Sequence, residues 1–168
     1  MASSESAADA MTHDLPTPVA TRYFEDYPAG ATCEYGPVSV SEAEIVAFAR
    51  QFDPQSIHTD AEAAASGPFG GLIASGWHTA GLMMRLLATR FLSPVASIAS
   101  PGIDELRWRA PVRPGDALRI RVRIVEATLS RSKPDRGMIR SEIEVVNQHE
   151  TVVMSLSAMN LMRSRPRA

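Results

Sequence analysis

The sequence contains little of what marks several classes of protein. Its single cysteine, Cys33, cannot form an intramolecular disulfide, so a reducing compartment is expected. Neither sign of charge dominates, because 17 Lys and Arg residues stand against 19 Asp and Glu residues and give a net charge of −2. This balance argues against a general nucleic-acid binder and against a polybasic membrane protein.

Targeting and cofactor signatures are also missing from the sequence. Residues 1–16 carry acidic side chains and no apolar core, so we expect neither a signal peptide nor a membrane anchor, and a cytoplasmic location. No Cys and His cluster has metal-ligand spacing, and no Walker or dinucleotide-binding glycine pattern opens a helix. We therefore expect no metal, no bound cofactor, and no nucleic-acid or membrane partner.

The length of 168 residues fits one domain, which buries roughly 70% of the surface that its unfolded chain exposes. Residues 1–20 are rich in Ala, Ser, Thr and Pro and have too few apolar side chains to pack, so a disordered tail is predicted there. We expect the domain itself at 21–163, followed by a short C-terminal tail at 164–168.

The most apolar stretch, residues 73–92, contains no proline and carries apolar side chains on every side of a helical wheel. It predicts a buried helix. Arg85 and Arg90 interrupt it, and a membrane span needs ~20 consecutive apolar residues. Its apolar surroundings must therefore come from the rest of the chain or from a second copy.

A second helix is predicted from Ser41 to Phe52. Ser41 and Glu44 form a capping box, and Asp53-Pro54 ends the pattern. The inward face is expected to comprise the residues spaced at helical intervals, Ile45, Phe48, Ala49 and Phe52. A short alanine-rich turn, 61–65, follows with Asp60 as its cap.

The remaining chain shows the alternation typical of strands, with turn signals between the segments. The predicted strands are 31–40, broken at Gly36-Pro37, then 95–98, 102–109, 117–129, 138–147 and 152–162. Helices followed by a run of antiparallel strands predict an α+β domain, with the sheet curled around the one all-apolar helix. This arrangement is the hot-dog fold.

The segment between the two helices holds the clearest candidate for chemistry. Asp53 and His58 lie there on a loop fixed at both ends, and a carboxylate beside an imidazole can position and deprotonate water. On spacing alone, however, a turn aspartate and a solvated surface histidine explain the two residues better.

Three motifs in order strengthen the chemical interpretation: Asp53-Pro-Gln-Ser-Ile-His58, Phe69-Gly-Gly-Leu-Ile-Ala-Ser-Gly76 and Arg107-Trp-Arg-Ala-Pro-Val-Arg-Pro-Gly-Asp116. Together they resemble the MaoC-like hydratase/dehydratase family, the (R)-specific enoyl-CoA hydratases of hot-dog fold. The resemblance extends over about residues 22 to 162, nearly all of the expected domain.

The resemblance implies roles for individual residues. Asp53 and His58 would activate the water that adds to, or leaves from, C3 of an acyl-CoA thioester, and the Gly76 backbone N–H would bind the thioester oxygen. Without the resemblance, close packing of a strand on the helix is the favoured explanation of Gly76. Substrate contacts are expected from Gly71, Ser75, Arg107 and Arg109.

Three positions depart from the family pattern. The family usually has Asn-Pro between the acid and the base, where this chain has Gln55-Ser56, and it often has His before the oxyanion glycine, where this chain has Ser75. Both members of the acid–base pair are retained, so activity is expected to be retained with them.

Other conspicuous residues have structural explanations. His78 is expected to be a hydrogen-bonded core histidine or a pocket wall, His149 a hairpin-turn residue, and Met83 and Met84 core residues. Basic residues that could attract coenzyme A phosphates, or merely line solvated strand faces, are Arg107, Arg109, Arg113, Arg131, Lys133 and Arg136.

The sequence thus predicts a hydro-lyase that interconverts 2-enoyl-CoA and (R)-3-hydroxyacyl-CoA, with the acyl-CoA thioester as substrate. Exposed strand edges lead us to expect a homodimer, with a higher oligomer left open. Two alternatives stay open: a hot-dog thioesterase, for which residues 70–85 supply no carboxylate near the helix start, and a subunit that binds acyl-CoA without turnover.

Overall fold

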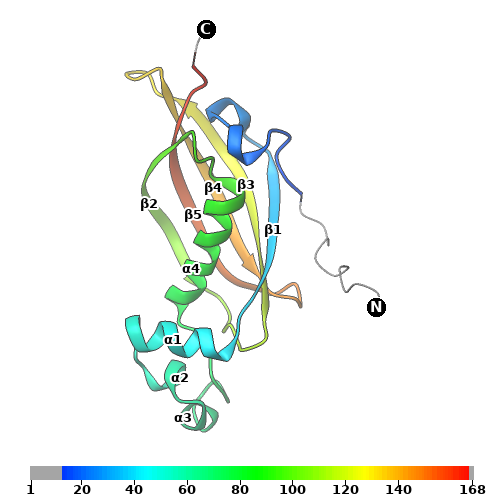
Figure 1. Cartoon of the computed structure of the whole chain (residues 1–168), viewed down its shortest axis with the longest axis vertical. Helices are drawn as coiled ribbons and strands as arrows, with labels where there is room; N and C mark the ends of the chain where they lie inside the picture. The colour runs from blue at the N-terminus through cyan, green and yellow to red at the C-terminus, as the bar shows by residue number, and fades with distance from the viewer. Residues whose placement is uncertain (1–12, 167–168) are drawn as a thin grey trace, which may run out of the picture.

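The computed structural model describes residues 13–166 as a sheet with one long helix lying along its inner face (Figure 1). The five strands are antiparallel in the order β1-β3-β4-β5-β2. Their bounds are β1 (Thr32–Ser39), β2 (Ser97–Trp108), β3 (Ala117–Leu129), β4 (Arg136–Val146) and β5 (Val152–Arg163). The predicted hot-dog fold is confirmed.

The long helix α4 (Gly76–Leu86) continues into a π-helical turn, η3 (Leu87–Phe91). Three shorter helices precede it in the chain: α1 (Glu42–Phe52), α2 (Ser56–Thr59) and α3 (Ala61–Ala65). They gather beyond one end of the sheet, next to the start of α4 (Figure 1). Two 3-10 turns, η1 (Val19–Thr21) and η2 (Phe24–Asp26), lie at the opposite end.

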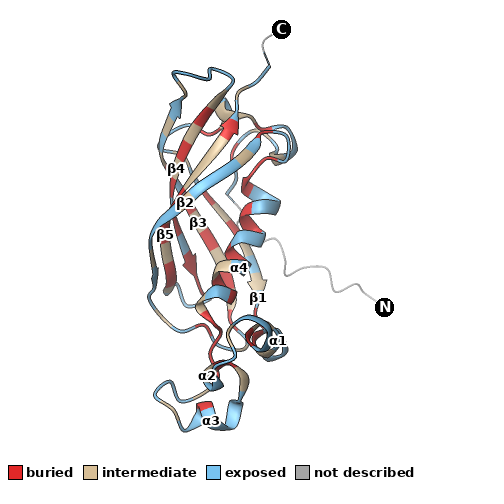
Figure 2. Ribbon diagram, turned by 90° about the vertical axis from the view of Figure 1, so that its left-hand side faces the viewer, coloured by how far each residue is buried: buried red, intermediate tan, exposed pale blue. Residues whose placement is uncertain are grey.

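The core lies between α4 and the inner face of the sheet. The alternation predicted for β3 and β4 holds, since each strand turns every second side chain into the core. Figure 2 colours the buried residues red along the ribbon. These buried residues are Leu118, Ile120, Val122, Ile124, Ile139, Ile143 and Val145, each at most 1% exposed. Leu82 and Leu86 of α4 pack against them.

Burial of α4 is one-sided, which corrects the prediction of a helix buried all round. Trp77 and Met84 are 58% and 45% exposed, whereas Met83 is buried. The sheet covers a single side of the helix, so the single chain leaves an apolar stripe of α4 uncovered. Similarly, Phe52 lies 64% exposed on α1, although its helical spacing predicted burial.

Strand β1 continues through Gly36-Pro37, where a break was predicted. The register with β3 shifts between Tyr35 and Val38, so the extra residues form an irregularity within the strand. A Cβ at Gly36 would lie 2.9 Å from the Leu118 carbonyl oxygen, and the backbone there has φ +125°. Only glycine fits this close approach of the two backbones.

Strand β2 is continuous where two short segments were predicted, because irregularities in its pairing with β5 interrupt the alternation. It forms one edge of the sheet. Most of its residues are exposed on both faces, and Figure 2 draws it largely in pale blue.

The expected N-terminal tail is structured from residue 13 onward. Leu15 is buried, and the fully buried guanidinium of Arg22 donates to Asp14 Oδ1 at 2.5 Å. The same guanidinium donates to the Arg90 carbonyl at 3.1 Å, at the end of the central helix. These bonds attach the segment to the fold, and residues 1–12 lie outside the described residues.

The expected C-terminal tail is likewise bonded as far as it is described. The Arg165 guanidinium donates to Asp26 Oδ2 at 2.6 Å, and the Ser164 N–H donates to the Asp135 carbonyl. Residues 167–168 lie outside the described residues.

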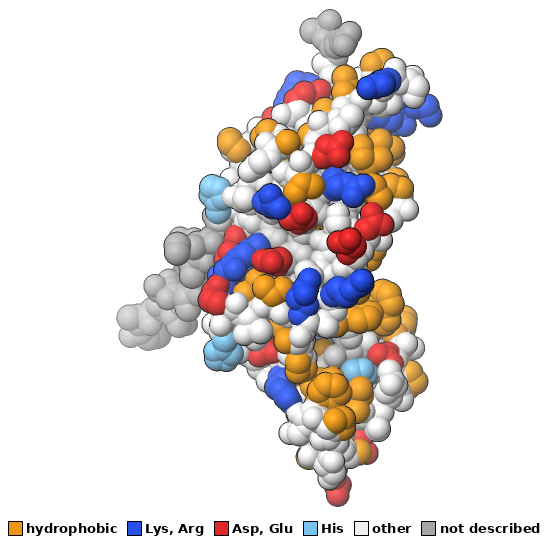
Figure 3. Space-filling view, turned by 180° about the vertical axis from the view of Figure 1, so that it is seen from behind, with side chains coloured by type: hydrophobic (Ala, Val, Ile, Leu, Met, Phe, Trp, Pro, Cys, Tyr) orange, Lys and Arg blue, Asp and Glu red, His pale blue; other side chains and the backbone are white. Residues whose placement is uncertain are grey.

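The outer face of the sheet is polar, and Figure 3 shows Arg and Glu side chains interspersed across it. Arg119 and Arg121 of β3 both pair with Glu34 and Glu150. Among residues 13–166, no helix is long and apolar enough to span a bilayer.

Candidate active site

The acid and the base come from the two ends of a tight turn between α1 and α2. The predicted capping box of Ser41 and Glu44 starts α1, and the helix ends at Asp53, before Pro54. His58 then sits in the short helix α2, 5% exposed. The turn brings His58 Nε2 within 3.4 Å of Asp53 Oδ2.

The other ring nitrogen fixes the orientation of His58. His58 Nδ1 lies 2.8 Å from the Ile73 carbonyl oxygen. Because a carbonyl only accepts, Nδ1 is assigned the proton and Nε2 carries the lone pair of the neutral imidazole. Nε2 is therefore the nitrogen that can exchange a proton beside the carboxylate.

Two side chains hold the Asp53 carboxylate. Gln55 Nε2 donates to Oδ1 at 2.7 Å, and Ser75 Oγ donates to Oδ2 at 2.7 Å. The Gln55 hydrogen bond first and the Ser75 bond second keep the pKa of the Asp53 carboxyl below its ordinary value, with a smaller contribution from nearby His58. Asp53 is thus ionised at neutral pH.

A cavity of about 320 Å³ opens next to this pair. Most of its wall is apolar, with a few polar groups, as is usual for small-molecule sites. The lining residues are His58, Phe69, Ile73, Ala74, Gly76, Thr79, Trp108, Arg109, Ala110, Pro111, Val112 and Val153.

Gly76 is the first residue of α4 and lines the cavity. Its position places a backbone N–H at the positive end of the helix dipole. The indole of Trp108 lies against its Cα, so that a Cβ at Gly76 would overlap the ring. Both explanations of this glycine, close packing and an open N–H, are therefore compatible with its surroundings.

The four residues expected to contact the substrate lie in different parts of the structure. Arg109 lines both the cavity and a groove on the outer surface of the sheet, and its Nε donates to Ser155 Oγ of that groove at 2.7 Å. Arg107 faces the same groove, with Arg123 and Arg140. Ser75 is fully buried and bonded to Asp53, and Gly71 lies in the loop before α4, near Arg113.

The other basic residues do not line the cavity. Arg113 donates to the Phe69 carbonyl at 2.6 Å and so holds the loop that carries Phe69. Arg131, Lys133 and Arg136 lie at the tip of the β3–β4 hairpin, at the opposite end of the molecule from α1–α3 (Figure 1).

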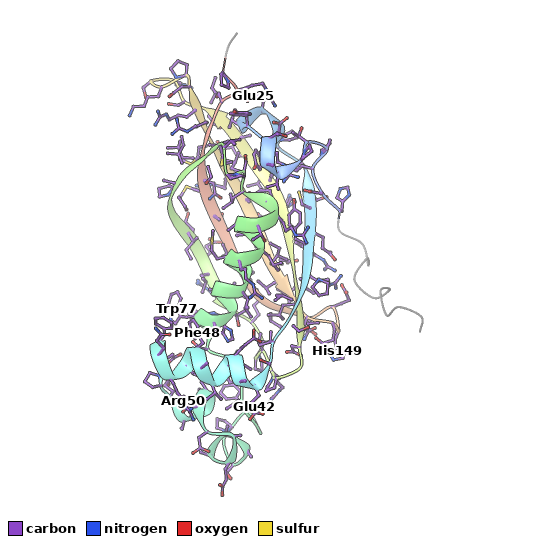
Figure 4. All side chains as sticks on the ribbon, in the orientation of Figure 1. Glu25, Glu42, Phe48, Arg50, Trp77 and His149 are labelled. Atoms are coloured by element: carbon purple, nitrogen blue, oxygen red, sulfur yellow. The ribbon has the colours of Figure 1, made fainter. Side chains whose placement is uncertain are left out.

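His78 belongs to the contact between α1 and α4 instead of to the cavity wall. The His78 ring stacks on the Phe48 ring with their centroids 4.9 Å apart. Figure 4 labels Phe48 on α1 and Trp77, the residue before His78, on α4. The predicted hydrogen bond is wrong for Nδ1, which is buried without a partner. Burial lowers the pKa of His78.

Sequence reasoning missed Thr79, Trp108 and Phe69 as cavity residues. Thr79 lies one helical turn after Gly76 on the same face of α4, so helical spacing carried a usable signal. Trp108 and Phe69 reach the site from β2 and from the loop before α4, and no local pattern predicts that approach.

The fold and the site define a hot-dog protein with an aspartate–histidine pair beside the start of its central helix. The MaoC like domain matches residues 26–147, and the chain belongs to this family of hydratases and dehydratases. Among residues 13–166, no group of His, Cys, Asp and Glu side chains is arranged to hold a metal ion.

Named relatives agree with this assignment. A 3-hydroxybutyryl-CoA dehydratase from Methylorubrum extorquens is 40% identical over 105 residues, which cover 62% of this chain and 64% of that protein. A 3-hydroxyacyl-thioester dehydratase from Mycobacterium tuberculosis is 37% identical over 84 residues, which cover 49% of this chain and 56% of that protein. The matched segments thus span less than two thirds of either dehydratase.

Solved structures agree over more of the chain. A MaoC-like dehydratase from Rhodospirillum rubrum has a TM-score of 0.81 and 40% identity, over 88% of this chain and 100% of that one. An R-hydratase from Pseudomonas aeruginosa has a TM-score of 0.69 and 27% identity, over 86% of each chain.

Proposed function

We propose that the protein is a hydro-lyase that interconverts 2-enoyl-CoA and (R)-3-hydroxyacyl-CoA thioesters. The observation that carries this proposal is the Asp53–His58 pair, 3.4 Å apart, with His58 and the Gly76 backbone lining one cavity. The dehydratase and R-hydratase names of similar proteins support it.

The geometry suits addition of water to a conjugated thioester. A water held between Asp53 Oδ2 and His58 Nε2 gives a proton to Nε2 while its oxygen bonds to C3. The C2–C3 double-bond electrons shift toward the thioester oxygen, whose growing negative charge the Gly76 N–H and the α4 dipole stabilise. C2 then takes the proton from Nε2, so that H and OH are added in total; dehydration is the reverse.

The cavity can accommodate a short acyl group. Its volume of about 320 Å³ is at the lower end of the ~300–1,000 Å³ range typical of ligand pockets. Trp108 and Val153 line it from the sheet side. A four-carbon substrate such as crotonyl-CoA is therefore the first choice, in keeping with the substrate in the name of the Methylorubrum relative.

The polar part of the thioester requires a cation at the mouth of the cavity. Arg109 is exposed and lines this cavity, so we assign it to the coenzyme A moiety. Arg107 lines the outer groove, as Arg109 also does, but does not line this cavity, so it is less well placed for the same role.

The exposed edge strand suggests a homodimer. Strand β2 is open on both faces and carries the half-exposed Ile103 and Trp108, close to the uncovered stripe of α4 that includes Trp77. A strand edge of this kind needs cover, and an antiparallel sheet can pair with the same strand of a second copy about a two-fold axis. A second copy is thus the occupant that fits this edge.

Thioester hydrolysis is a second candidate, favoured by one observation. A thioesterase needs a carboxylate near the start of the central helix, and the fold brings Asp53 there, bonded to Ser75 at the α4 N-cap. The two reactions differ in product, because hydrolysis releases free coenzyme A thiol and hydration does not.

Incubation of the purified protein with crotonyl-CoA tests the proposal. We expect loss of the enoyl-thioester absorbance, formation of the (R)-3-hydroxy product on chiral analysis, and no thiol release. Thiol release would establish the thioesterase. Binding of crotonyl-CoA and of longer enoyl-CoAs without turnover of any of them would establish a non-catalytic binding subunit.

A further inference from the structure

Two of the three departures from the family pattern, Gln55 and Ser75, meet at the same carboxylate. They lie 20 residues apart in the chain, yet each donates a 2.7 Å hydrogen bond to a different oxygen of Asp53. Ser75 is fully buried, and its hydroxyl does not line the cavity wall. Its side chain therefore faces the acid instead of the substrate.

The Ser75 hydroxyl has only one orientation that satisfies both of its neighbours. Ser75 Oγ accepts from the Trp77 N–H at 3.2 Å as the N-cap of α4. Because an N–H can only donate, the hydroxyl proton is left for Asp53 Oδ2. One side chain thus ties the acid at the end of α1 to the helix start that carries the Gly76 N–H.

Two donors on separate oxygens also fix the plane of a carboxylate. With Oδ1 held by Gln55 and Oδ2 by Ser75, the carboxylate cannot rotate away from His58 Nε2. Small losses of alignment at reacting groups cost large factors in rate. Gln55 is exposed and Ser75 is buried, so the serine bond is better shielded from water.

We propose that Ser75, assisted by Gln55, is a positioning residue that holds the Asp53 carboxylate toward His58 and toward the start of α4. This inference rests on the proposed function for its kinetic consequence. The hydrogen-bonded arrangement itself is testable without turnover.

Substitution of Ser75 by Ala is the kinetic test, on crotonyl-CoA. We expect kcat to fall by about 10- to 100-fold with little change in KM, because the acid is misaligned while the cavity wall is intact. Loss of the Ser75 hydrogen bond, which favours the anion, should raise the pKa of Asp53. Because Asp53 acts in its ionised form, the acid limb of the pH profile of kcat should move to higher pH. The titratable group facing Asp53 is His58 from α2, whereas its other contacts, Gln55 and Ser75, are neutral.

Two controls separate positioning from a structural effect. Ser41→Ala removes the N-cap hydroxyl of α1, a helix of the same 11-residue length, and should lower stability without moving the pH profile. In an Asp53→Asn background, Ser75→Ala should lower kcat little further, because the two residues act as one unit.

Direct titration of Asp53 by carboxyl ¹³C NMR tests the same arrangement without any substrate. The Asp53 resonance is assigned by its loss in Asp53→Asn, and we expect it to titrate at higher pH in Ser75→Ala than in the wild type. An unchanged titration, or a Ser75→Ala variant with wild-type kcat and acid limb, overturns the inference. If the wild type does not turn over thioesters, but Asp53 still titrates at higher pH in Ser75→Ala than in the wild type, only the proposed function is contradicted.

Discussion

Gly76 occupies the most constrained position among the residues around the cavity. The indole of Trp108 covers its Cα, and its backbone N–H heads α4. Gly76 must therefore both leave room for the Trp108 indole and present its N–H. Substitution by alanine separates these two roles, because it fills the space but retains the N–H.

Gly76→Ala should displace the Trp108 indole and lower kcat/KM at least about tenfold, since small misplacements at reacting groups are costly. Gly81→Ala is the matched control, because a Cβ at Gly81 meets nothing within 4 Å. Steady-state kinetics on both variants and on Gly76→Ala/Trp108→Ala make the measurement. Recovery in the double variant would assign the glycine to packing, and full activity of Gly76→Ala would contradict the clash itself.

His78 gives a prediction about pH and stability. Burial lowers its pKa in the folded state, so the unfolded chain binds the proton more readily. Protonation of His78 in the unfolded chain therefore does not reduce the stability of the fold above the pKa of an unfolded histidine, ~6.5, and reduces it progressively as the pH falls below that value. We expect His78→Phe, which keeps the stack on Phe48, to lose less stability between pH 7 and pH 5 than the wild type does.

Urea unfolding at several pH values makes this measurement. The exposed turn residue His149 supplies the control, and His149→Gln should retain the wild-type slope. Equal slopes for His78→Phe and the wild type would show that His78 does not titrate against the fold.

At the residue scale, the sequence predicted the identity of the acid and the base better than their partners. The spacing of Asp53 and His58 within one turn is local, so a motif records it. The bond from Ser75 to Asp53 joins residues 22 positions apart, and it depends on how α1 meets α4. Such a contact is set by tertiary packing, which no window of sequence contains.

At the scale of elements, local rules succeeded wherever periodicity and capping are determined by the chain itself. The α1 capping box, the Asp60 cap of α3 and the bounds of β3 are as predicted. Prediction failed where an element depends on its neighbours. One face of α4 is uncovered, and β2 runs on through Pro101, because partners outside the element decide burial and pairing.

The central helix α4 gives a prediction about the stability of the fold. Leu82→Ala or Leu86→Ala should each cost ~2–5 kcal/mol of unfolding free energy, as expected for buried leucines. Arg85→Ala, an exposed polar residue of the same helix, should cost less than about 0.5 kcal/mol. Denaturant unfolding distinguishes these values, and a loss under about 1 kcal/mol for both leucines would mean that α4 is not the core.

At the scale of the whole molecule, exposed apolar side chains lie on or beside β2, among them Trp77, Ile103 and Trp108. Trp77 and Trp108 contact each other edge to face with centroids 5.3 Å apart, and both are about half exposed. An apolar surface around an open strand edge is typical of an interface. The hot-dog architecture was predictable from element order, whereas this surface was not, because β2 alone shows no clean alternation.

Ile103→Glu places a charge on this edge and should convert a dimer into a monomer, since a buried unpaired charge is costly. Light scattering after size exclusion measures the mass of each species. Val95→Glu, an equally exposed apolar residue just before β2, is the control and should stay dimeric. A wild type that is monomeric at micromolar concentration would contradict the proposed use of this edge.

Asp53 and His58 are proposed to act together on an enoyl thioester at this cavity. The most direct test is the rate of crotonyl-CoA hydration by Asp53→Asn and His58→Ala, each checked for unchanged fold, beside His149→Ala as an exposed control. We expect kcat to fall by about 10²–10⁴-fold in both site variants, which is the usual contribution of a general acid or base, and to stay at the wild-type value in the control. Wild-type rates in either site variant would contradict it.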